Sequence, residues 1–96
     1  MKLAFIGTGK IIADALFAIE PIKEIEKTAI FARPHSKEKA EAFAKQYNIA
    51  EVYTDYEKLL TETTADTVYI GLINSAHYSY AKQALLHGKN VILEKP

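Results

Sequence analysis

The sequence has no cysteine, so disulfide bonds and thiolate chemistry are excluded. It also has no excess of one charge, because twelve lysines and arginines balance twelve aspartates and glutamates over 96 residues. A chain without net charge has no field that would recruit nucleic acid or an anionic membrane surface. No apolar run approaches the roughly 20 residues needed to span a bilayer, and no residue cluster has the spacing of metal ligands. We therefore expect a small globular domain in the cytoplasm, without a metal.

The N-terminal segment carries the most informative motif. An apolar run that ends at Ile6 leads directly into Gly7-Thr8-Gly9, and residues 10–20 have the apolar spacing of a helix. A strand, a glycine turn and a helix in this order are typical of a site for dinucleotide phosphates. Gly7 permits a sharp turn, and Gly9 permits close approach of a pyrophosphate to the helix amides. The alternative is that both glycines only form a tight turn.

The whole chain alternates between strand and helix patterns. We predict strands at residues 2–6, 28–32, 51–53, 67–72 and 90–93. We predict helices at residues 10–20, between an N-cap at Ser36 and a stop at Asn48, after a cap at Asp55, and between a cap at Asn74 or Ser75 and an end at His87-Gly88. This alternation indicates an α/β fold with a doubly wound parallel sheet in the order 3-2-1-4-5 and helices on both faces.

In such a sheet, ligands bind beyond the carboxyl ends of the strands, where the strand order reverses. The segments that follow the predicted strands are residues 7–11, 32–36, 72–77 and 94–96, and they contain every polar cluster of interest. His77 lies in the first turn after the fourth predicted strand. We expect His35 and His87 to be an ordinary loop residue and a helix-end residue, and the six tyrosines to serve packing.

Four stretches spread over the whole chain carry a resemblance to a known family. They are Ile6-Gly7-Thr8-Gly9-Lys10-Ile11, residues 53–60, Asn74-Ser75-Ala76-His77-Tyr78, and residues 88–96 with Glu94-Lys95-Pro96 at their end. Together they resemble the nucleotide-binding half of the Gfo/Idh/MocA oxidoreductases, the family of glucose–fructose oxidoreductase and inositol dehydrogenase. The resemblance implies a Rossmann-like domain that binds NAD(P).

The same resemblance implies which residues form the site. The cofactor residues from these stretches are Gly7, Thr8, Gly9, Lys10, Ile11, Asn74, His77, Glu94 and Lys95, and Leu72, shortly before the third stretch, joins them through its backbone. Lys95 is implied to lie beside the nicotinamide and the substrate carbon, and Glu94-Lys95 to contact the nicotinamide ribose. Lys95 and His77 are therefore the catalytic candidates. The competing interpretations are a structural or solvated His77 and a charged strand exit at Glu94-Lys95.

Two positions depart from the common pattern. NAD-binding folds usually place an acid after the second strand for the ribose 2′-hydroxyl, but residues 31–35 contain none. Arg33 favours the 2′-phosphate of NADP instead, with Ser36 and Lys37 as further donors, unless Arg33 is only a solvated loop residue. In the glycine fingerprint of dinucleotide-binding folds, a third small residue, Gly or Ala, lets the first helix pack closely on the strand, and Ile12 stands at that position. We therefore expect the first helix to lie farther from the strand or in another register. NADP is thus the expected cofactor and NAD the alternative.

The resulting prediction is an oxidoreductase that transfers hydride between a nicotinamide cofactor and a hydroxyl-bearing carbon of a sugar, polyol or similar molecule. Lys95 would donate a hydrogen bond or proton to the carbonyl oxygen. By the resemblance, residues 1–96 are the dinucleotide-binding domain, and a second domain outside this chain supplies most of the substrate pocket and a homo-oligomer surface. A non-catalytic dinucleotide-binding or redox-sensing module and, less favoured, a methyltransferase are the alternatives.

Overall fold

The computed structural model describes the backbone of residues 1–72 and 74–93, and the side chains of residues 1–72 and 78–93. Strands and helices alternate along this part of the chain. The elements are β1 (Lys2–Ile6), α1 (Lys10–Ile19), β2 (Glu26–Phe31), the 3₁₀ turn η1 (Pro34–Ser36), α2 (Lys37–Tyr47), β3 (Glu51–Tyr53), α3 (Tyr56–Glu62), β4 (Thr67–Ile70), α4 (Asn74–Leu86) and β5 (Asn90–Leu93).

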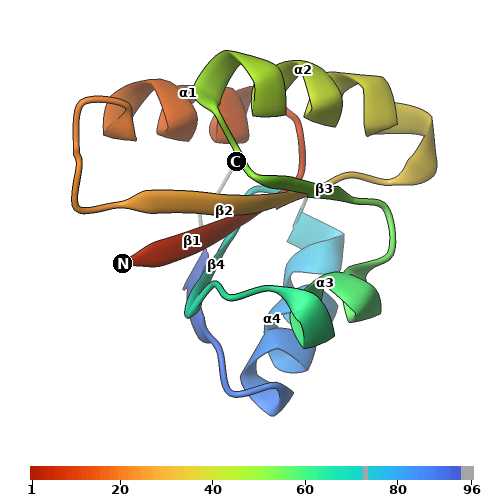
Figure 1. Ribbon diagram of the computed structural model, residues 1–96. Coiled ribbons are helices and arrows are strands. Elements are labelled where there is room, and N and C mark those ends of the chain that lie inside the picture. The colour runs from red at the N-terminus through yellow and green to blue at the C-terminus, as the bar shows by residue number, and fades with distance from the viewer. Residues whose placement is uncertain (73, 94–96) are drawn as a thin grey trace.

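The five strands form one parallel sheet in the order β3-β2-β1-β4-β5. Helices α1 and α2 cover one face of the sheet, and α3 and α4 cover the other (Figure 1). Parallel strands need crossover connections, which the helices provide. The predicted fold class and strand order are therefore confirmed.

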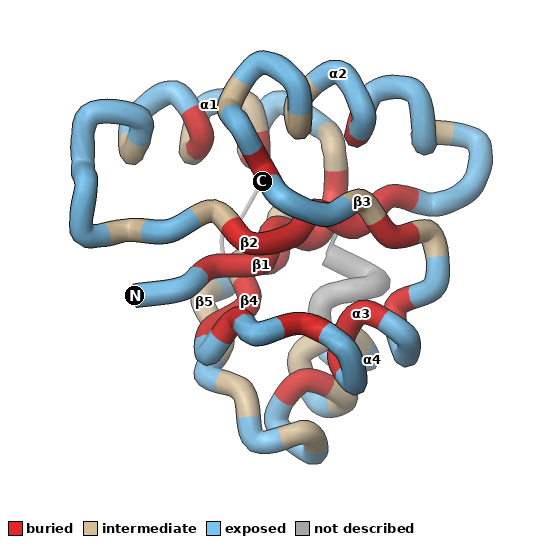
Figure 2. The backbone as a smooth tube through the Cα atoms, viewed as in Figure 1, coloured by how far each residue is buried: buried red, intermediate tan, exposed pale blue. Residues whose placement is uncertain are grey.

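The central strand β1 divides the core into two layers. Leu3 and Phe5 belong to the cluster under α1 and α2, whereas Ala4 and Ile6 belong to the cluster under α3 and α4. All four residues are buried, and Figure 2 shows buried residues concentrated along the central strands β1 and β2. Because neighbouring side chains of a strand point to opposite faces, a strand that is covered on both faces is apolar without interruption.

Strand bounds match the prediction at residues 2–6, 51–53 and 90–93, and differ in two strands. β2 spans Glu26–Phe31 and not residues 28–32. It begins earlier because Glu26 pairs with Lys2 and its amide donates to the Met1 carbonyl at 2.8 Å. β4 ends at Ile70 and not at residue 72, and the chain turns away at Gly71. Helix α1 is one residue shorter than predicted.

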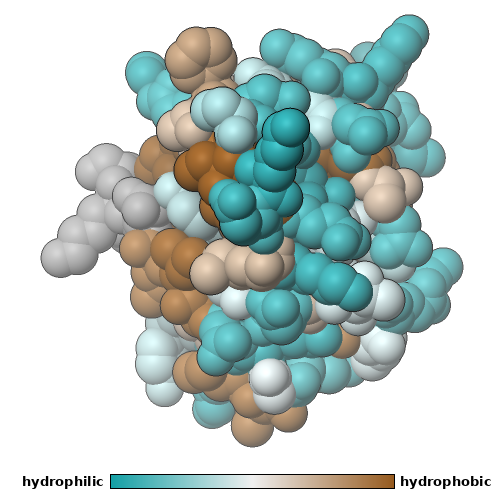
Figure 3. All heavy atoms as spheres, turned by 60° about the vertical axis from the view of Figure 1, so that its left-hand side comes forward, coloured by the Kyte–Doolittle hydropathy of each residue, from teal (hydrophilic) through white to brown (hydrophobic). Residues whose placement is uncertain are grey.

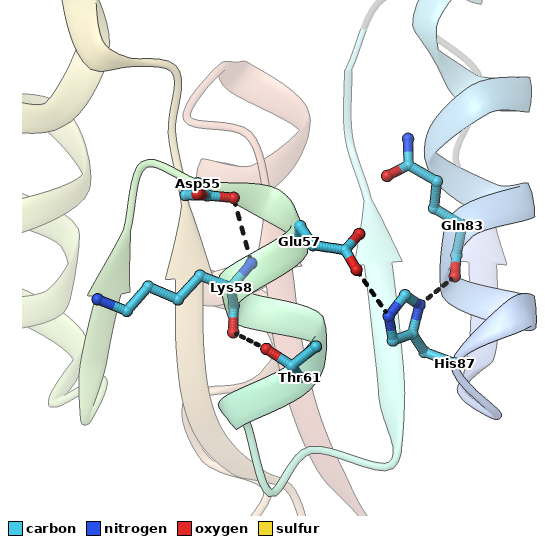
Figure 4. Close-up of polar contacts among 6 residues, drawn as sticks. All are labelled: Asp55, Glu57, Lys58, Thr61, Gln83 and His87. Carbon is cyan, nitrogen blue, oxygen red and sulfur yellow. Dashed lines mark hydrogen bonds and ion pairs between the residues drawn. The ribbon is translucent and has the colours of Figure 1, made fainter.

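Three of the predicted helix ends are confirmed and one is wrong in detail. Asn48 and Gly88 adopt the left-handed conformation, with φ of 57° and 75°, that ends helices α2 and α4. Asp55 caps α3, since its Oδ1 accepts from the Lys58 amide at 3.2 Å (Figure 4). Ser36 holds the N-cap position of α2 but makes no capping hydrogen bond with its side chain, because it belongs to η1.

Helices α3 and α4 are joined by polar and aromatic contacts. His87 contacts the Gln83 carbonyl through Nδ1 at 2.9 Å and the Glu57 carboxylate through Nε2 at 3.3 Å (Figure 4). Deeper in the same layer, the Tyr56 hydroxyl donates to the Tyr80 carbonyl at 2.8 Å, and the two rings lie 4.6 Å apart. His87 therefore lies at a helix end, as predicted, and also links α4 to α3.

Some large apolar side chains reach the surface, and Figure 3 shows brown groups among the hydrophilic ones. The outer face of α4 exposes Tyr78, Leu85 and Leu86, whereas among the described side chains of this helix Ala84 is buried and Tyr80 and Ala81 pack against the core partly buried. These three large side chains of α4 thus lie outside the core. Among the described residues, no helix has both the length and the apolar character needed to cross a bilayer.

Candidate functional site

A cavity of about 200 Å³ opens at the carboxyl ends of β1, β2 and β4. These three strands are neighbours in the sheet, and β1 is the strand from which the order departs in both directions. The cavity is lined by Gly7, Thr8, Gly9, Ala32, Arg33, His35, Ser36, Gly71 and Leu72. Segments far apart in sequence thus meet where ligands bind in open parallel sheets.

Gly7 forms the sharp turn at the end of β1. Its φ is +118°, which residues with a side chain rarely adopt, and its amide donates to the Phe31 carbonyl at 2.9 Å. A Cβ at this position would meet the Gly71 carbonyl oxygen and a Leu72 methyl group, each at 3.1 Å. The fold itself therefore requires glycine at position 7.

Gly9 differs from Gly7, because the fold does not require it. It occupies the N-cap position of α1 with an ordinary φ of −81°, and a Cβ there would have no neighbour within 4 Å. The missing side chain leaves open the space beside the first amides of a ten-residue helix that has no acid in its first turn. Such a helix end favours a phosphate, so the residues present fit the pyrophosphate of a dinucleotide.

The cavity lining contains no carboxylate. Its ionisable side chains are Arg33 and His35, which follow β2. Within the described part of the chain, the side chains of Arg33, His35 and Ser36 make no hydrogen bond or ion pair, so all three are available to a ligand. This arrangement suits an anionic group at the end of β2.

The structure brings six predicted cofactor residues together in the cavity lining: Gly7, Thr8, Gly9, Arg33, Ser36 and Leu72. Lys10 and Ile11 are not part of that lining. The Lys10 ammonium instead pairs with Asp14 at 2.8 Å, a hydrogen bond that raises the pKa of Lys10. The side chains of Asn74 and His77, and all of Glu94 and Lys95, lie outside the described residues.

Three lining residues were not predicted from the sequence: Ala32, His35 and Gly71. Gly71 ends a buried apolar run, and a glycine in a strand pattern often marks a close approach of another part of the chain. The approaching group is Ile12, whose Cγ1 and Cδ1 would lie 2.8 Å from a Cβ on Gly71. The described residues hold no group of three potential metal ligands.

A parallel sheet with a glycine turn and a helix N-terminus at the reversal of strand order defines a dinucleotide-binding domain of the Rossmann class. The chain belongs to the Gfo/Idh/MocA family, described as "Oxidoreductase family, NAD-binding Rossmann fold", and the family model matches residues 1–96. The family predicted from the sequence motifs is thus confirmed.

Two curated relatives and one solved structure are similar over nearly the whole chain. A trans-1,2-dihydrobenzene-1,2-diol dehydrogenase of Xenopus laevis is 32% identical over 95 residues, covering 99% of this chain and 29% of the relative. A scyllo-inositol 2-dehydrogenase (NADP(+)) of Bacillus subtilis is 33% identical over 96 residues, covering 100% of this chain and 29% of the relative. A 3-ketoreductase of Actinomadura kijaniata, solved with NADP and TDP-benzene, superposes with a TM-score of 0.88 at 32% identity, covering 100% of this chain and 29% of that one.

Proposed function

We propose that this chain binds NADP in preference to NAD and forms the nucleotide-binding part of an oxidoreductase. The reaction would transfer hydride between the nicotinamide and a hydroxyl-bearing carbon of a sugar, polyol or similar small molecule. The single observation that carries the proposal is the cavity at the reversal of strand order, with a glycine turn on one side and Arg33 on the other.

The phosphate part of the proposal depends on the turn after β1. Thr8, Gly9 and the N-terminus of α1 offer hydrogen-bond donors and the positive end of a helix dipole. Gly9 leaves room for the pyrophosphate beside them, since a Cβ there would project into open space. A dinucleotide would thus lie across the carboxyl ends of β1 and β2.

The preference for NADP depends on the segment after β2. An acid in this segment would repel a 2′-phosphate, but the cavity lining has none, and Arg33 is exposed with no protein partner among the described residues. A guanidinium pairs well with a phosphate because it donates two parallel hydrogen bonds. The NADP in the name of the Bacillus relative and in the solved 3-ketoreductase supports the same choice.

The catalytic part of the proposal involves residues outside the described ones. Bound nicotinamide supplies the hydride donor or acceptor. We propose that Lys95 donates a hydrogen bond or proton to the substrate oxygen, and that His77 lies near the same group. The two curated relatives are named for an inositol and a cyclic diol, which both bear hydroxyl groups on ring carbons, and this supports a polyol-like substrate.

A further domain would complete the substrate site. The chain spans 29% of the length of each curated relative named above, so most of their length has no counterpart here. We propose that the whole protein carries a substrate-binding domain, and that residues 1–96 alone bind the cofactor without turning over polyols. Correct positioning of a substrate can lower the activation barrier by about 7–11 kcal/mol. Without the domain that positions the substrate, we expect no turnover.

The test is a calorimetric titration of the chain with NADP and with NAD, at low and at high salt. NADP should bind more tightly, and the gap should shrink with salt because the contact is partly exposed. Arg33→Ala should reduce the ratio of the NADP and NAD affinities by about tenfold. This corresponds to the lower end of the free energy that a charge-assisted hydrogen bond contributes. Lys23→Ala is the matched control, since Lys23 is exposed near the opposite, amino ends of the strands. Equal affinities in the unaltered chain, or a preference for NAD, would contradict the assignment.

A further inference from the structure

His35 is the unexpected residue of the cavity, since its sequence context predicts only an ordinary loop residue. The segment between β2 and α2 accounts for its position. The Ala32 amide donates to the Tyr53 carbonyl at 3.0 Å, which holds the exit of β2 beside β3. Pro34 then begins η1, and the Ser36 amide donates back to the Arg33 carbonyl at 2.8 Å. This tight turn places Arg33, His35 and Ser36 along one cavity wall.

We propose that His35 contacts the 2′-phosphate of NADP together with Arg33, and is a second residue that determines cofactor specificity. The inference rests on the proposed function and names a further contact within it. An imidazole ring always carries at least one N–H donor, and a phosphate offers three acceptor oxygens. Lys37, which the sequence suggests as a further donor, is not part of the cavity lining.

The surroundings of His35 favour a phosphate over a protein partner. Its side chain is exposed and makes no hydrogen bond or ion pair within the described residues, and no carboxylate lines the cavity beside it. His87 provides the contrast, because both of its ring nitrogens are engaged, by Gln83 and Glu57. Of these two histidines, only His35 therefore has a ring free for a ligand.

The alternative is that the His35 ring packs against the adenine. NAD and NADP share the adenine and differ only in the 2′-phosphate, so the two interpretations make different predictions. Loss of a phosphate contact weakens only the phosphorylated ligand, whereas loss of packing weakens both ligands equally. The adenosine halves of the two cofactors, 5′-AMP and adenosine 2′,5′-bisphosphate, are suitable probes because they need no nicotinamide contact.

The experiment compares the affinities of these two nucleotides for the unaltered chain, His35→Ala, His35→Lys and the control His87→Ala. A melting curve confirms that each variant is folded. We expect His35→Ala to lower the affinity for the bisphosphate about three- to tenfold and to leave 5′-AMP binding unchanged. A loss of this size corresponds to the free energy that one hydrogen bond contributes. His35→Lys should restore the preference, because it returns a hydrogen-bond donor to the same place. His87→Ala should change neither affinity, since His87 lies at the other end of the sheet.

The outcomes separate the inference from the proposed function. If the unaltered chain prefers the bisphosphate and His35→Ala keeps that preference in full, the inference is wrong and the proposed function stands. Equal losses for both nucleotides also overturn it, in favour of packing against the adenine. If the unaltered chain binds neither nucleotide, or does not distinguish them, the proposed NADP site fails as well.

Discussion

Ile12 of α1 lies directly against Gly71, the residue that follows β4. A Cβ on Gly71 would come within 2.8 Å of both Cγ1 and Cδ1 of Ile12, and Ile12 is fully buried. A large residue on the helix is thus matched by the absence of a side chain just after the strand. In the glycine fingerprint, a small residue on the helix normally allows the helix and the strand to approach closely. In this chain Gly71, across the contact from the helix, allows that approach.

The first prediction follows from this pair. Gly71→Ala should destabilise the fold by about 1–3 kcal/mol, since the added methyl group overpacks a closely filled contact. Urea unfolding followed by circular dichroism measures the loss. In the double variant with Ile12→Ala, the total loss should be smaller than the sum of the single losses, with a coupling of about 0.5–3 kcal/mol. Strict additivity would show that the two residues do not share this space.

The second prediction separates the two glycines of the phosphate turn. Gly9→Val should remain folded and lose cofactor binding, because the new side chain would fill the space beside the helix N-terminus and not meet the protein. Gly7→Ala should lower the melting temperature, because its φ of +118° strains any residue with a side chain. Melting curves and NADP titrations of both variants provide the comparison. A folded Gly9→Val chain with unchanged affinity would remove this glycine from the site.

The sequence predicted the sheet order because each strand and helix has a clear period, and parallel crossovers allow few arrangements. It also predicted the glycine turn and Arg33, since both follow a predicted strand directly. It missed the Ile12–Gly71 contact and the placement of His35. The first depends on packing between residues far apart in sequence, and the second on the 3₁₀ turn after Arg33, which has no strong periodic signal.

The third prediction concerns the buried Tyr56 hydroxyl. Tyr56→Phe should lower the free energy of unfolding by about 0.5–1.5 kcal/mol, because the hydrogen bond to the Tyr80 carbonyl is lost while the ring contacts remain. Burial, with a smaller effect of Tyr80, raises the pKa of Tyr56 far above its ordinary value of 10.0. A raised pKa in the folded state contributes stability below pH 10 that is lost as the pH rises further, because only the unfolded phenol ionises there.

Denaturant midpoints at pH 8 and above pH 10 test this prediction. Tyr56→Phe should lose less stability between the two conditions than the unaltered chain. Tyr78→Phe is the matched control, because Tyr78 is 77% exposed and should affect neither midpoint. If Tyr56→Phe loses as much stability between pH 8 and alkaline pH as the unaltered chain does, the loss is caused by other ionisable groups.

The last prediction concerns acid and the loop before β4. The Asp66 carboxylate accepts from the Thr67 hydroxyl at 2.8 Å and from the Lys2 amide at 3.3 Å. These two hydrogen bonds, with the nearby positive charges, lower the pKa of Asp66 below its ordinary value of 3.8. The Asp66 backbone also bonds to Lys2 and Asn90, so this residue joins the amino ends of β1, β4 and β5.

A lowered pKa in the folded state contributes stability above the unfolded pKa, and that stability is lost as the pH falls through the folded pKa. The unaltered chain should therefore lose stability on acidification from about pH 4 downward. Asp66→Asn should lose less over the same interval, because an amide does not titrate, and should be the less stable chain at neutral pH. Urea midpoints at pH 6 and pH 3 measure the difference, with Glu41→Gln on the exposed side of α2 as the control. If Asp66→Asn and the unaltered chain lose the same stability, the carboxylate is not stabilised in the folded state, and its contacts to Thr67 and Lys2 do not persist in solution.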